Sequence, residues 1–418
     1  MATQPRTAAV GAPVETGHTA TWALAFGQLV SWGSLYYSFS LLVVPMEQTI
    51  GWTRTETNAA LSIGLLVSGI TAYPIGAWID RGRGRRVMVA GSALGTAMLL
   101  VWSQATSLAL VFVAWIGLGV AIAATLYDPV FSVVTHRYPL TFKRRITLIT
   151  LLGGFASTVF IPLTQYFVDL WGWRGALLGL AAINLLICVP IHLFAIDSSR
   201  SPTVRTTARA DAAGISRDAS RRALRTPAFW GLAVCFTTYF LTFAALTFHL
   251  VPLMTGRGVP TDIMLTTMAL IGPAQVFARA AWFTVGRNLS TPTVGIIILI
   301  LYPISIVLLM LAGSAAAMLF TFAICYGAAN GMMTILRGTV VQELLWKEGY
   351  GTISGLLSLP SNIAKGVAPI AAAGLWQARH NYVAVEWAAL AIAVVSAAAF
   401  VYAIRASRRS AATIVTSP

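Results

Sequence analysis

Long apolar stretches recur along almost the whole 418-residue chain, and they constrain its fold more than any other feature. An apolar stretch of about 18 to 25 residues is long enough to cross the ~30 Å hydrocarbon core of a bilayer as a helix. Twelve such stretches lie at 20–45, 57–79, 87–103, 107–134, 146–168, 175–196, 228–254, 263–284, 293–311, 315–336, 351–376 and 383–404. The sequence therefore predicts an all-α membrane protein with twelve transmembrane helices.

The distribution of charge predicts the orientation of these helices. The chain is 57% hydrophobic and 10% charged, which is too little charge for a soluble protein of this length. Its net charge is +15, but with the N-terminus inside, 22 of the 28 Lys and Arg residues fall in cytoplasmic segments. This asymmetry follows the positive-inside rule, so both termini are expected in the cytoplasm. The basic character is then a matter of topology, and we expect no nucleic-acid partner.

One long polar segment divides the chain into two parts of similar length. The predicted parts are a cytoplasmic tail at 1–19, a six-helix bundle at 20–196, a cytoplasmic linker at 197–226, a second six-helix bundle at 227–404 and a cytoplasmic tail at 405–418. The halves match at an offset of 207 residues: Val44-Pro45 with Val251-Pro252, Gly51 with Gly258, and Pro162 with Pro369. A duplicated six-helix unit can rock about a midplane site, which is the geometry of alternating access.

A Gly- and Arg-rich loop follows the second stretch. Its order of residues is that of G-x-x-x-D-R-x-G-R-R, carried by Gly76, Asp80, Arg81, Gly84, Arg85 and Arg86. An ordinary basic loop would need neither the glycines nor an Asp among arginines. The loop resembles the signature of the major facilitator superfamily. That resemblance implies the pseudo-symmetric twelve-helix fold, and it implies that these residues form a gate latch through charge and helix-dipole contacts. The equivalent loop of the second half keeps little beyond Gly286-Arg287.

Shorter motifs resemble the monocarboxylate and oxalate/formate carriers within this superfamily. They are Lys143-Arg144-Arg145, Pro162, Gly172-Trp173-Arg174 and the segment from Gln275 to Arg279. The monocarboxylate family has an Asp four residues before a buried Arg, and here Arg279 matches while Gln275 replaces the Asp. The stretch at 114–119 lacks the arginine usual in the fourth span, and 153–162 lacks the drug/proton antiporter pattern, which argues against a typical multidrug exporter.

Four ionisable residues, Asp128, Arg279, Lys365 and His249, lie inside apolar stretches, where a charge at mid-span costs roughly 2.5–3.5 kcal/mol on insertion scales. Arg279 either binds a substrate anion or pairs with an acid such as Asp128 or with backbone carbonyls. Asp128, followed by Pro129, is either the proton-coupling residue or part of a static ion pair. Lys365 either adds to an anion site or extends toward an interface.

Other polar residues in the predicted spans are candidates for a cavity wall. Tyr36, Tyr127 and Asn330 are assigned to substrate binding, with helix packing as the alternative for each. His249 is expected near the external boundary. Arg337 and Glu343 are expected to border the cytoplasmic loop after the tenth span, where their charges cost little.

The sequence thus favours a secondary transporter for a small organic solute, such as a monocarboxylate, driven by proton coupling or exchange. The alternatives are an efflux carrier for a drug or metalloid and a non-transporting receptor with the same fold. The three cysteines lack metal-ligand spacing and no nucleotide-binding P-loop is evident, so we expect no enzyme activity, no cofactor and no metal site. A bacterial inner-membrane location and a functional monomer are expected.

Overall fold

The computed structural model describes residues 18–52, 54–196, 208–284 and 289–416, and their regular structure is helical. The elements of the first half are α1 (His18–Trp32), η1 (Gly33–Tyr37), α2 (Phe39–Ile50), α3 (Arg54–Trp78), η2 (Ile79–Arg83), α4 (Gly84–Ser103), α5 (Leu108–Thr125), α6 (Tyr127–Arg137), α7 (Phe142–Gly153), α8 (Ala156–Ile183), η3 (Asn184–Cys188) and α9 (Val189–Phe194). The elements η1, η2 and η3 are single wide turns of π-helix.

A helix α10 (Ala208–Arg225) precedes the second half. The elements that follow are α11 (Pro227–Gly256), α12 (Thr261–Thr284), α13 (Thr291–Ala312), α14 (Ala316–Leu344), α15 (Tyr350–Arg379) and α16 (Val383–Thr416). The first eleven residues of the predicted linker, together with Gly286-Arg287, lie outside the described residues, whereas the rest of the linker forms α10.

Eight helical segments among the described residues are long and apolar enough to cross a membrane. Two of them, Glu56–Ser103 and Phe142–Phe194, contain 48 and 53 residues. At 1.5 Å per residue each is more than twice the ~30 Å thickness of the hydrocarbon core, so each accommodates two crossings. The backbone leaves helical geometry inside both, at Arg81 and Gly82 in the first and at Gly172 in the second.

The helix that continues from α5 into α6 is broken where the sequence places Pro129. The backbone of Leu126 is extended, with ψ of −153°. Proline has no N–H to donate to the carbonyl four residues earlier, which is that of Thr125. The side-chain amide of Gln28 donates to this carbonyl instead, at 2.6 Å. The break therefore places Tyr127 and Asp128 at the start of a new helix, α6.

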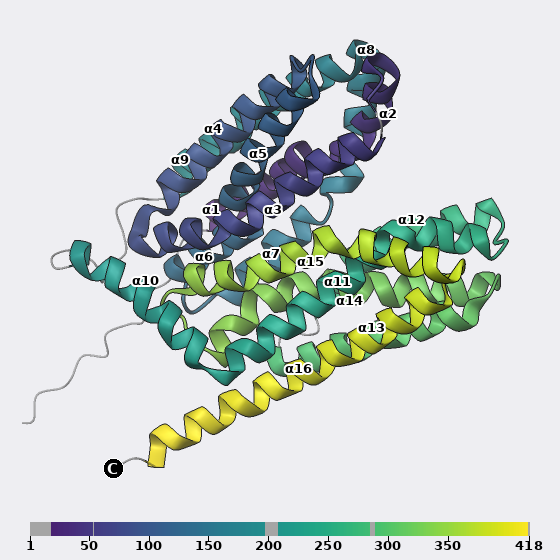
Figure 1. The fold of residues 1–418 in the computed structure, drawn as a ribbon. Coiled ribbons are helices and arrows are strands. Elements are labelled where there is room, and N and C mark those ends of the chain that lie inside the picture. Colours follow the sequence, from purple (N-terminus) through teal and green to yellow (C-terminus); the bar gives the residue numbers. More distant parts are fainter. Residues whose placement is uncertain (1–17, 53, 197–207, 285–288, 417–418) are drawn as a thin grey trace, which may run out of the picture.

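The helices form two bundles that follow the order of the chain (Figure 1). In the first, α3 packs on α5, α4 on α5 and α8, and α1 on α7. In the second, α11 packs on α15 and α16, and α14 packs on α12 and α13. The bundles meet through α3 with α15, α7 with α12 and α14, and α6 with α15. These junctions place residues of both halves side by side.

Glycines at the end of the first helical unit of each half share one backbone conformation. Gly51 has φ of +79° and Gly258 has φ of +68°. Residues with a Cβ rarely adopt this left-handed region, so glycine allows the turn that each half makes here. The equivalence holds at the 207-residue offset seen in the sequence, as expected for a repeated unit.

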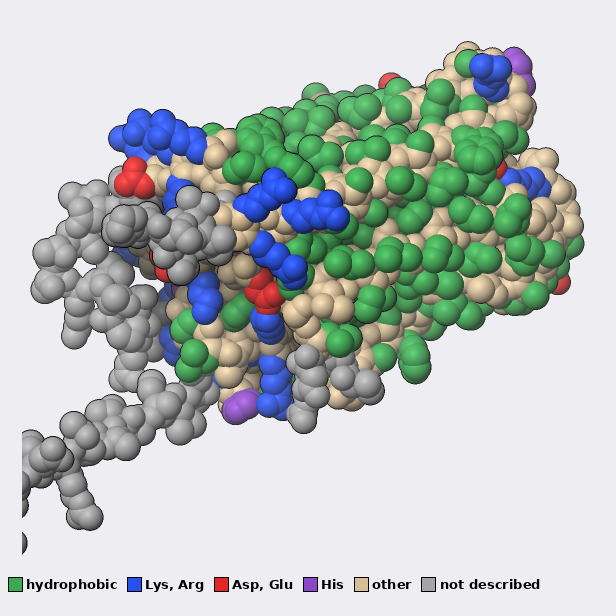
Figure 2. Space-filling view, turned by 90° about the horizontal axis from the view of Figure 1, so that it is seen from below, with side chains coloured by type: hydrophobic (Ala, Val, Ile, Leu, Met, Phe, Trp, Pro, Cys, Tyr) green, Lys and Arg blue, Asp and Glu red, His purple; other side chains and the backbone are tan. Residues whose placement is uncertain are grey.

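Basic side chains gather at one end of the molecule, beside α10 and the C-terminal part of α16 (Figures 1 and 2). We call this the linker end. Figure 2 shows that the remainder of the visible face is covered mainly by hydrophobic side chains. Ile, Leu, Val, Phe and Trp side chains on α8, α12, α13 and α16 are exposed. A surface of this kind is suited to contact with the lipid tails of a bilayer.

Candidate functional site

An ion pair joins the two halves at the break between α5 and α6. Nη2 of Arg337, on α14, lies 2.9 Å from Oδ2 of Asp128, in the first turn of α6. Ser358 of α15 donates its hydroxyl to the same carboxylate oxygen at 2.7 Å, and Arg337 also contacts this hydroxyl. Asp128 therefore has a cation and a hydroxyl as partners, and it lies at the positive end of the α6 dipole.

Arg337 is not at the loop border where the sequence analysis placed it. The helix α14 continues to Leu344, beyond the predicted span end at residue 336, so Arg337 lies inside it. Only 13% of its side chain is exposed, compared with 30% for Asp128. The predicted alternative of a pair between Arg279 and Asp128 is also wrong, because Arg337 occupies that position.

Lys365 lies near this ion pair, two helical turns after Ser358 on α15. Its Nζ donates to the side-chain oxygen of Asn362 at 3.3 Å and lies 4.1 Å from the centre of the Phe240 ring on α11. The Arg337 guanidinium carbon lies 5.5 Å from the centre of the same ring. The Phe240 ring thus forms cation–π contacts with both Lys365 and Arg337, because the face of an aromatic ring attracts positive charge.

Arg279 is buried, with 5% of the residue exposed, and it also connects the halves. Its Nε donates to the carbonyl of Gly331 on α14 at 3.0 Å, and its Nη1 donates to the carbonyl of Thr150 on α7 at 3.2 Å. Backbone carbonyls were one of the predicted partners. They satisfy hydrogen-bond donors but do not neutralise the positive charge.

Aromatic side chains of the first half lie next to Arg279. Trp32 contacts Tyr36, Tyr37 and Tyr127 at ring-centre distances of 5.3, 6.0 and 5.0 Å. Tyr37 and Tyr127 lie close enough to Arg279 to interact with it electrostatically. The structure therefore places Tyr36 and Tyr127 in one aromatic group, beside the break that also positions Asp128.

Asn330 belongs to the second half. It precedes Gly331, the carbonyl partner of Arg279, and it is half-buried on α14. His249, which the sequence analysis placed near the boundary, lies between the Tyr382 hydroxyl at 3.2 Å and the Pro369 carbonyl at 3.0 Å. His249 is thus held by residues of the second half.

The signature loop contacts the first turn of α15. One oxygen of Asp80 accepts from the backbone N–H of Gly351 at 2.9 Å, and the other accepts from the N–H and hydroxyl of Thr352, each at 2.7 Å. These N–H groups have no partner within their own helix, and a carboxylate is favoured at this positive end. His136 of α6 lies 3.4 Å from the same carboxylate, whose side chain is 2% exposed.

The loop is one residue longer between Arg81 and Gly84 than the family pattern. The structure accommodates this residue in the wide turn η2, where Gly82 has φ of +75°. Gly84, Arg85 and Arg86 then form the first turn of α4. Gly76 precedes the loop on α3 and lies against the backbone of Gly351, so close that a Cβ there would be 2.0 Å from the Gly351 carbonyl oxygen.

Further contacts between the halves lie near the Asp80 contact. Lys143 pairs with Glu343, so this acid borders the loop as expected but also joins α7 to α14. Gln342 contacts the hydroxyl of Thr135, and Lys347 donates to the carbonyl of Pro139 at 3.3 Å. Together with Asp80 they hold the halves together at the linker end.

The charges at the junction do not balance. Arg337 is paired with Asp128, whereas Arg279 is held by backbone carbonyls and Lys365 by the side chain of Asn362. Within the described ranges, no carboxylate forms an ion pair with Arg279 or Lys365. The same ranges contain no group of three or more His, Cys, Asp or Glu residues able to hold a metal. The arrangement suits an anion.

The role of Arg337 was missed because helix ends are hard to locate from hydropathy. The sequence carries a signal: the five residues after Arg337 are uncharged and include Val340 and Val341, so the span can continue past residue 336. A longer span with Arg337 inside would have suggested a partner for Asp128.

Comparisons with known proteins identify the family and the fold. A family model described as "Major Facilitator Superfamily" matches residues 24–369. The chain is 28% identical over 336 residues to rat "Monocarboxylate transporter 13", covering 77% of this chain and 72% of the relative. Its fold is similar to that of the human organic anion transporter TETRAN, with a TM-score of 0.72 and 16% identity over 94% of this chain and all of that one.

The structure of the fucose:proton symporter of E. coli is also similar, with a TM-score of 0.69 and 14% identity over 94% of this chain and 99% of that one. These likenesses confirm the predicted all-helical fold. The family match covers most of the described helices of both halves. The chain therefore belongs to the major facilitator superfamily, and it is a multi-pass membrane transporter rather than an enzyme.

Proposed function

We propose that the protein carries a small organic anion, such as a monocarboxylate, across a membrane by alternating access. The observation that carries the proposal is the pair of cations, Arg279 and Lys365, that lack a carboxylate partner among the described residues. A charged group inside a membrane bundle is costly unless it serves a partner or a ligand. A substrate carboxylate would supply the missing negative charge.

The remaining contacts of the anion would come from the aromatic group and the polar residue beside these cations. Tyr36 and Tyr127 offer hydroxyl donors from the first half, and Asn330 offers an amide from the second. Arg279 suits a carboxylate because its planar guanidinium forms two parallel hydrogen bonds. The names of two relatives, a monocarboxylate transporter and an organic anion transporter, support the same substrate class.

Alternating access follows from where the halves touch. The contacts of Asp80, Lys143, Gln342 and Lys347 close the linker end. We assign the latch to Gly76, Asp80, Arg81, Gly84, Arg85 and Arg86, as the family resemblance implies. Release of these contacts would open the site to the linker side, and the halves would then meet at the other end.

Proton coupling is assigned to Asp128. A proton on this carboxylate would remove its attraction to Arg337 and with it one contact between the halves. Exchange of one anion for another is the alternative form of coupling. The basic linker end suits the cytoplasmic side of a bacterial inner membrane, with both termini inside and the protein working as a monomer.

Flux in proteoliposomes tests the proposal. Purified protein is reconstituted and uptake of labelled monocarboxylates is compared for wild type, Arg279→Gln and Lys365→Gln. Loss of a charged hydrogen bond costs about 1.5–3 kcal/mol, so KM for the anion should rise on the order of 10- to 100-fold.

Arg405→Gln is the matched control, because Arg405 is an exposed arginine at the C-terminal part of α16. Its KM should equal that of wild type. Unchanged KM in both site variants would contradict the anion site, and flux of uncharged or cationic toxic compounds without carboxylate flux would favour the efflux alternative.

A further inference from the structure

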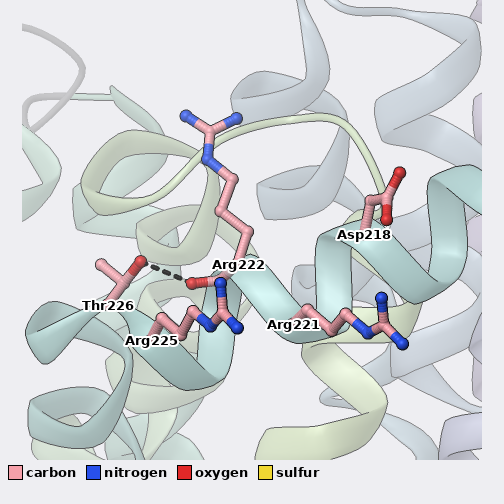
Figure 3. A pocket seen from close by; sticks show the side chains of 5 residues that line it. All are labelled: Asp218, Arg221, Arg222, Arg225 and Thr226. Atoms are coloured by element: carbon pink, nitrogen blue, oxygen red, sulfur yellow. Dashed lines mark hydrogen bonds between the residues drawn. The ribbon is translucent and has the colours of Figure 1, made fainter.

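We propose that α10 carries a binding site for the phosphate headgroup of an anionic phospholipid. The site is separate from the transport site and does not depend on the proposed substrate. It consists of a pocket of about 440 Å³ lined by Asp218, Arg221, Arg222, Arg225 and Thr226 (Figure 3).

The sequence of α10 places its arginines where they can act together. Arg221 and Arg225 are four residues apart and therefore lie on one face of the helix. Figure 3 shows their side chains extending in the same direction, while Arg222 extends away from them. All three arginines are exposed. With Asp218 included, the five lining residues carry a net charge of +2.

The other face of α10 fixes this pocket to the transporter. Ala219 and Ala223 are buried, and the hydroxyl of Ser220 lies 3.1 Å from that of Tyr73 on α3. The guanidinium carbon of Arg222 lies 4.2 Å from the centre of the Trp346 ring, in the connection from α14 to α15. The helix is therefore held against both halves while Arg221 and Arg225 remain available to a ligand.

The position of the pocket identifies its occupant as a lipid. α10 leads directly into the membrane helix α11, and Trp230 in the first turns of α11 is 53% exposed. The indole N–H of Trp230 donates to the carbonyl of Leu224 at 2.9 Å, and Leu224 is itself 46% exposed. Exposed Trp beside exposed Leu is typical of the headgroup level of a bilayer. Arginines at that level favour phosphate, which they bind through two parallel hydrogen bonds.

The test counts bound lipid on the full-length protein. Phosphatidylglycerol and phosphatidylcholine are titrated separately into purified protein, and bound lipid is measured by native mass spectrometry together with Tm. The variant Arg221→Gln with Arg225→Gln removes the pocket charge but leaves the Arg222–Trp346 contact intact. At about fivefold per basic residue, apparent affinity for phosphatidylglycerol should fall about 25-fold.

The control variant, Arg405→Gln with Arg408→Gln, removes two exposed arginines from α16 at the same end. It should keep wild-type affinity for phosphatidylglycerol, and phosphatidylcholine should bind all three proteins equally weakly. An equal loss in both variants, or no loss in the α10 variant, would overturn the proposal. Displacement of the lipid by millimolar inorganic phosphate would show that the site takes free phosphate rather than a headgroup.

The conservative variant Arg221→Lys with Arg225→Lys covers the case in which the glutamine variant does not fold. Lysine keeps the charge but not the planar fork that binds phosphate through two bonds. Its affinity should fall between those of wild type and the glutamine variant. Wild-type affinity in the lysine variant would show that charge alone acts here, and it would contradict a built phosphate pocket.

Discussion

Asp128 combines two roles that a single proton can change together. As an ionised group it stabilises the positive start of α6, and it holds Arg337 of the other half at 2.9 Å. A protonated carboxyl loses both interactions while its hydrogen bond with Ser358 can remain. In the proposed mechanism, proton binding at Asp128 therefore weakens the contact between the halves.

Asp128→Asn should separate proton coupling from transport. The amide imitates the protonated carboxyl, so accumulation of a labelled monocarboxylate driven by a pH gradient should fall at least about tenfold. Exchange of internal for external substrate at equal pH should persist. Asp169→Asn is the control, because Asp169 is exposed on α8, where it accepts a hydrogen bond from the neighbouring Gln165. Undiminished gradient-driven accumulation in Asp128→Asn would rule out this coupling residue.

Hydropathy can reveal the charged residues of a site but not their partners. Asp128, Arg279 and Lys365 were found because a charge inside an apolar stretch is conspicuous. Their partners were not found, since pairing depends on how two bundles dock. The Arg337–Asp128 pair spans 209 residues, and the two carbonyls that hold Arg279 belong to residues with no distinctive side chain.

At the scale of elements, the linker end depends on how closely α3 approaches α15. Glycine at 76 lets the two backbones touch, and this approach brings Asp80 to the free N–H groups of Gly351 and Thr352. Any side chain at position 76 would push the helices apart. The close packing that Gly76 allows is therefore what lets Asp80 cap α15.

Gly76→Ala should destabilise this contact. Its Cβ would lie 2.0 Å from the Gly351 carbonyl oxygen, a backbone atom that cannot rotate away, so the free energy of unfolding should fall by about 1–3 kcal/mol. Tm in detergent, followed by circular dichroism, measures the effect. Gly366→Ala on α15 is the control, since nothing lies within 4 Å of its Cβ position, and it should be neutral or slightly stabilising. Equal Tm values for the two variants would contradict the proposed close contact.

Elements were predicted well where hydropathy decides them and poorly where it does not. The apolar stretches correspond to helices because the bilayer requires every backbone polar group to bond internally. The ends differ: α14 runs eight residues past the predicted span and α16 reaches Thr416. Beyond the hydrocarbon core a helix continues on propensity and packing, which hydropathy does not measure. For the same reason, hydropathy did not reveal α10, which is a polar helix within the predicted linker.

At the scale of the whole molecule, the two halves meet along the close packing of α3 on α15 and through charged contacts around it. Asp80 with α15, Lys143 with Glu343, and Asp128 with Arg337 are charged contacts, and each joins one half to the other. Each of these contacts can be released when the halves separate, because water or substrate can then take the place of the lost partner, whereas the apolar packing inside each bundle has no such replacement. The two bundles are therefore expected to move as rigid bodies about this junction.

Distances between spin labels should show that movement as opposite changes at the two ends. One label pair uses exposed positions 140 and 408 at the linker end, and the other uses exposed positions 165 and 377 at the opposite end. Asp80→Asn removes the charge that caps α15, a contact worth about 0.5–2 kcal/mol, so the latched population should fall. Electron double resonance should then record longer 140–408 distances together with shorter 165–377 distances. Asp169→Asn should leave both unchanged. Lengthening of both pairs would indicate loosening of the fold instead, and constant distances in Asp80→Asn would show that the cap does not latch the transporter.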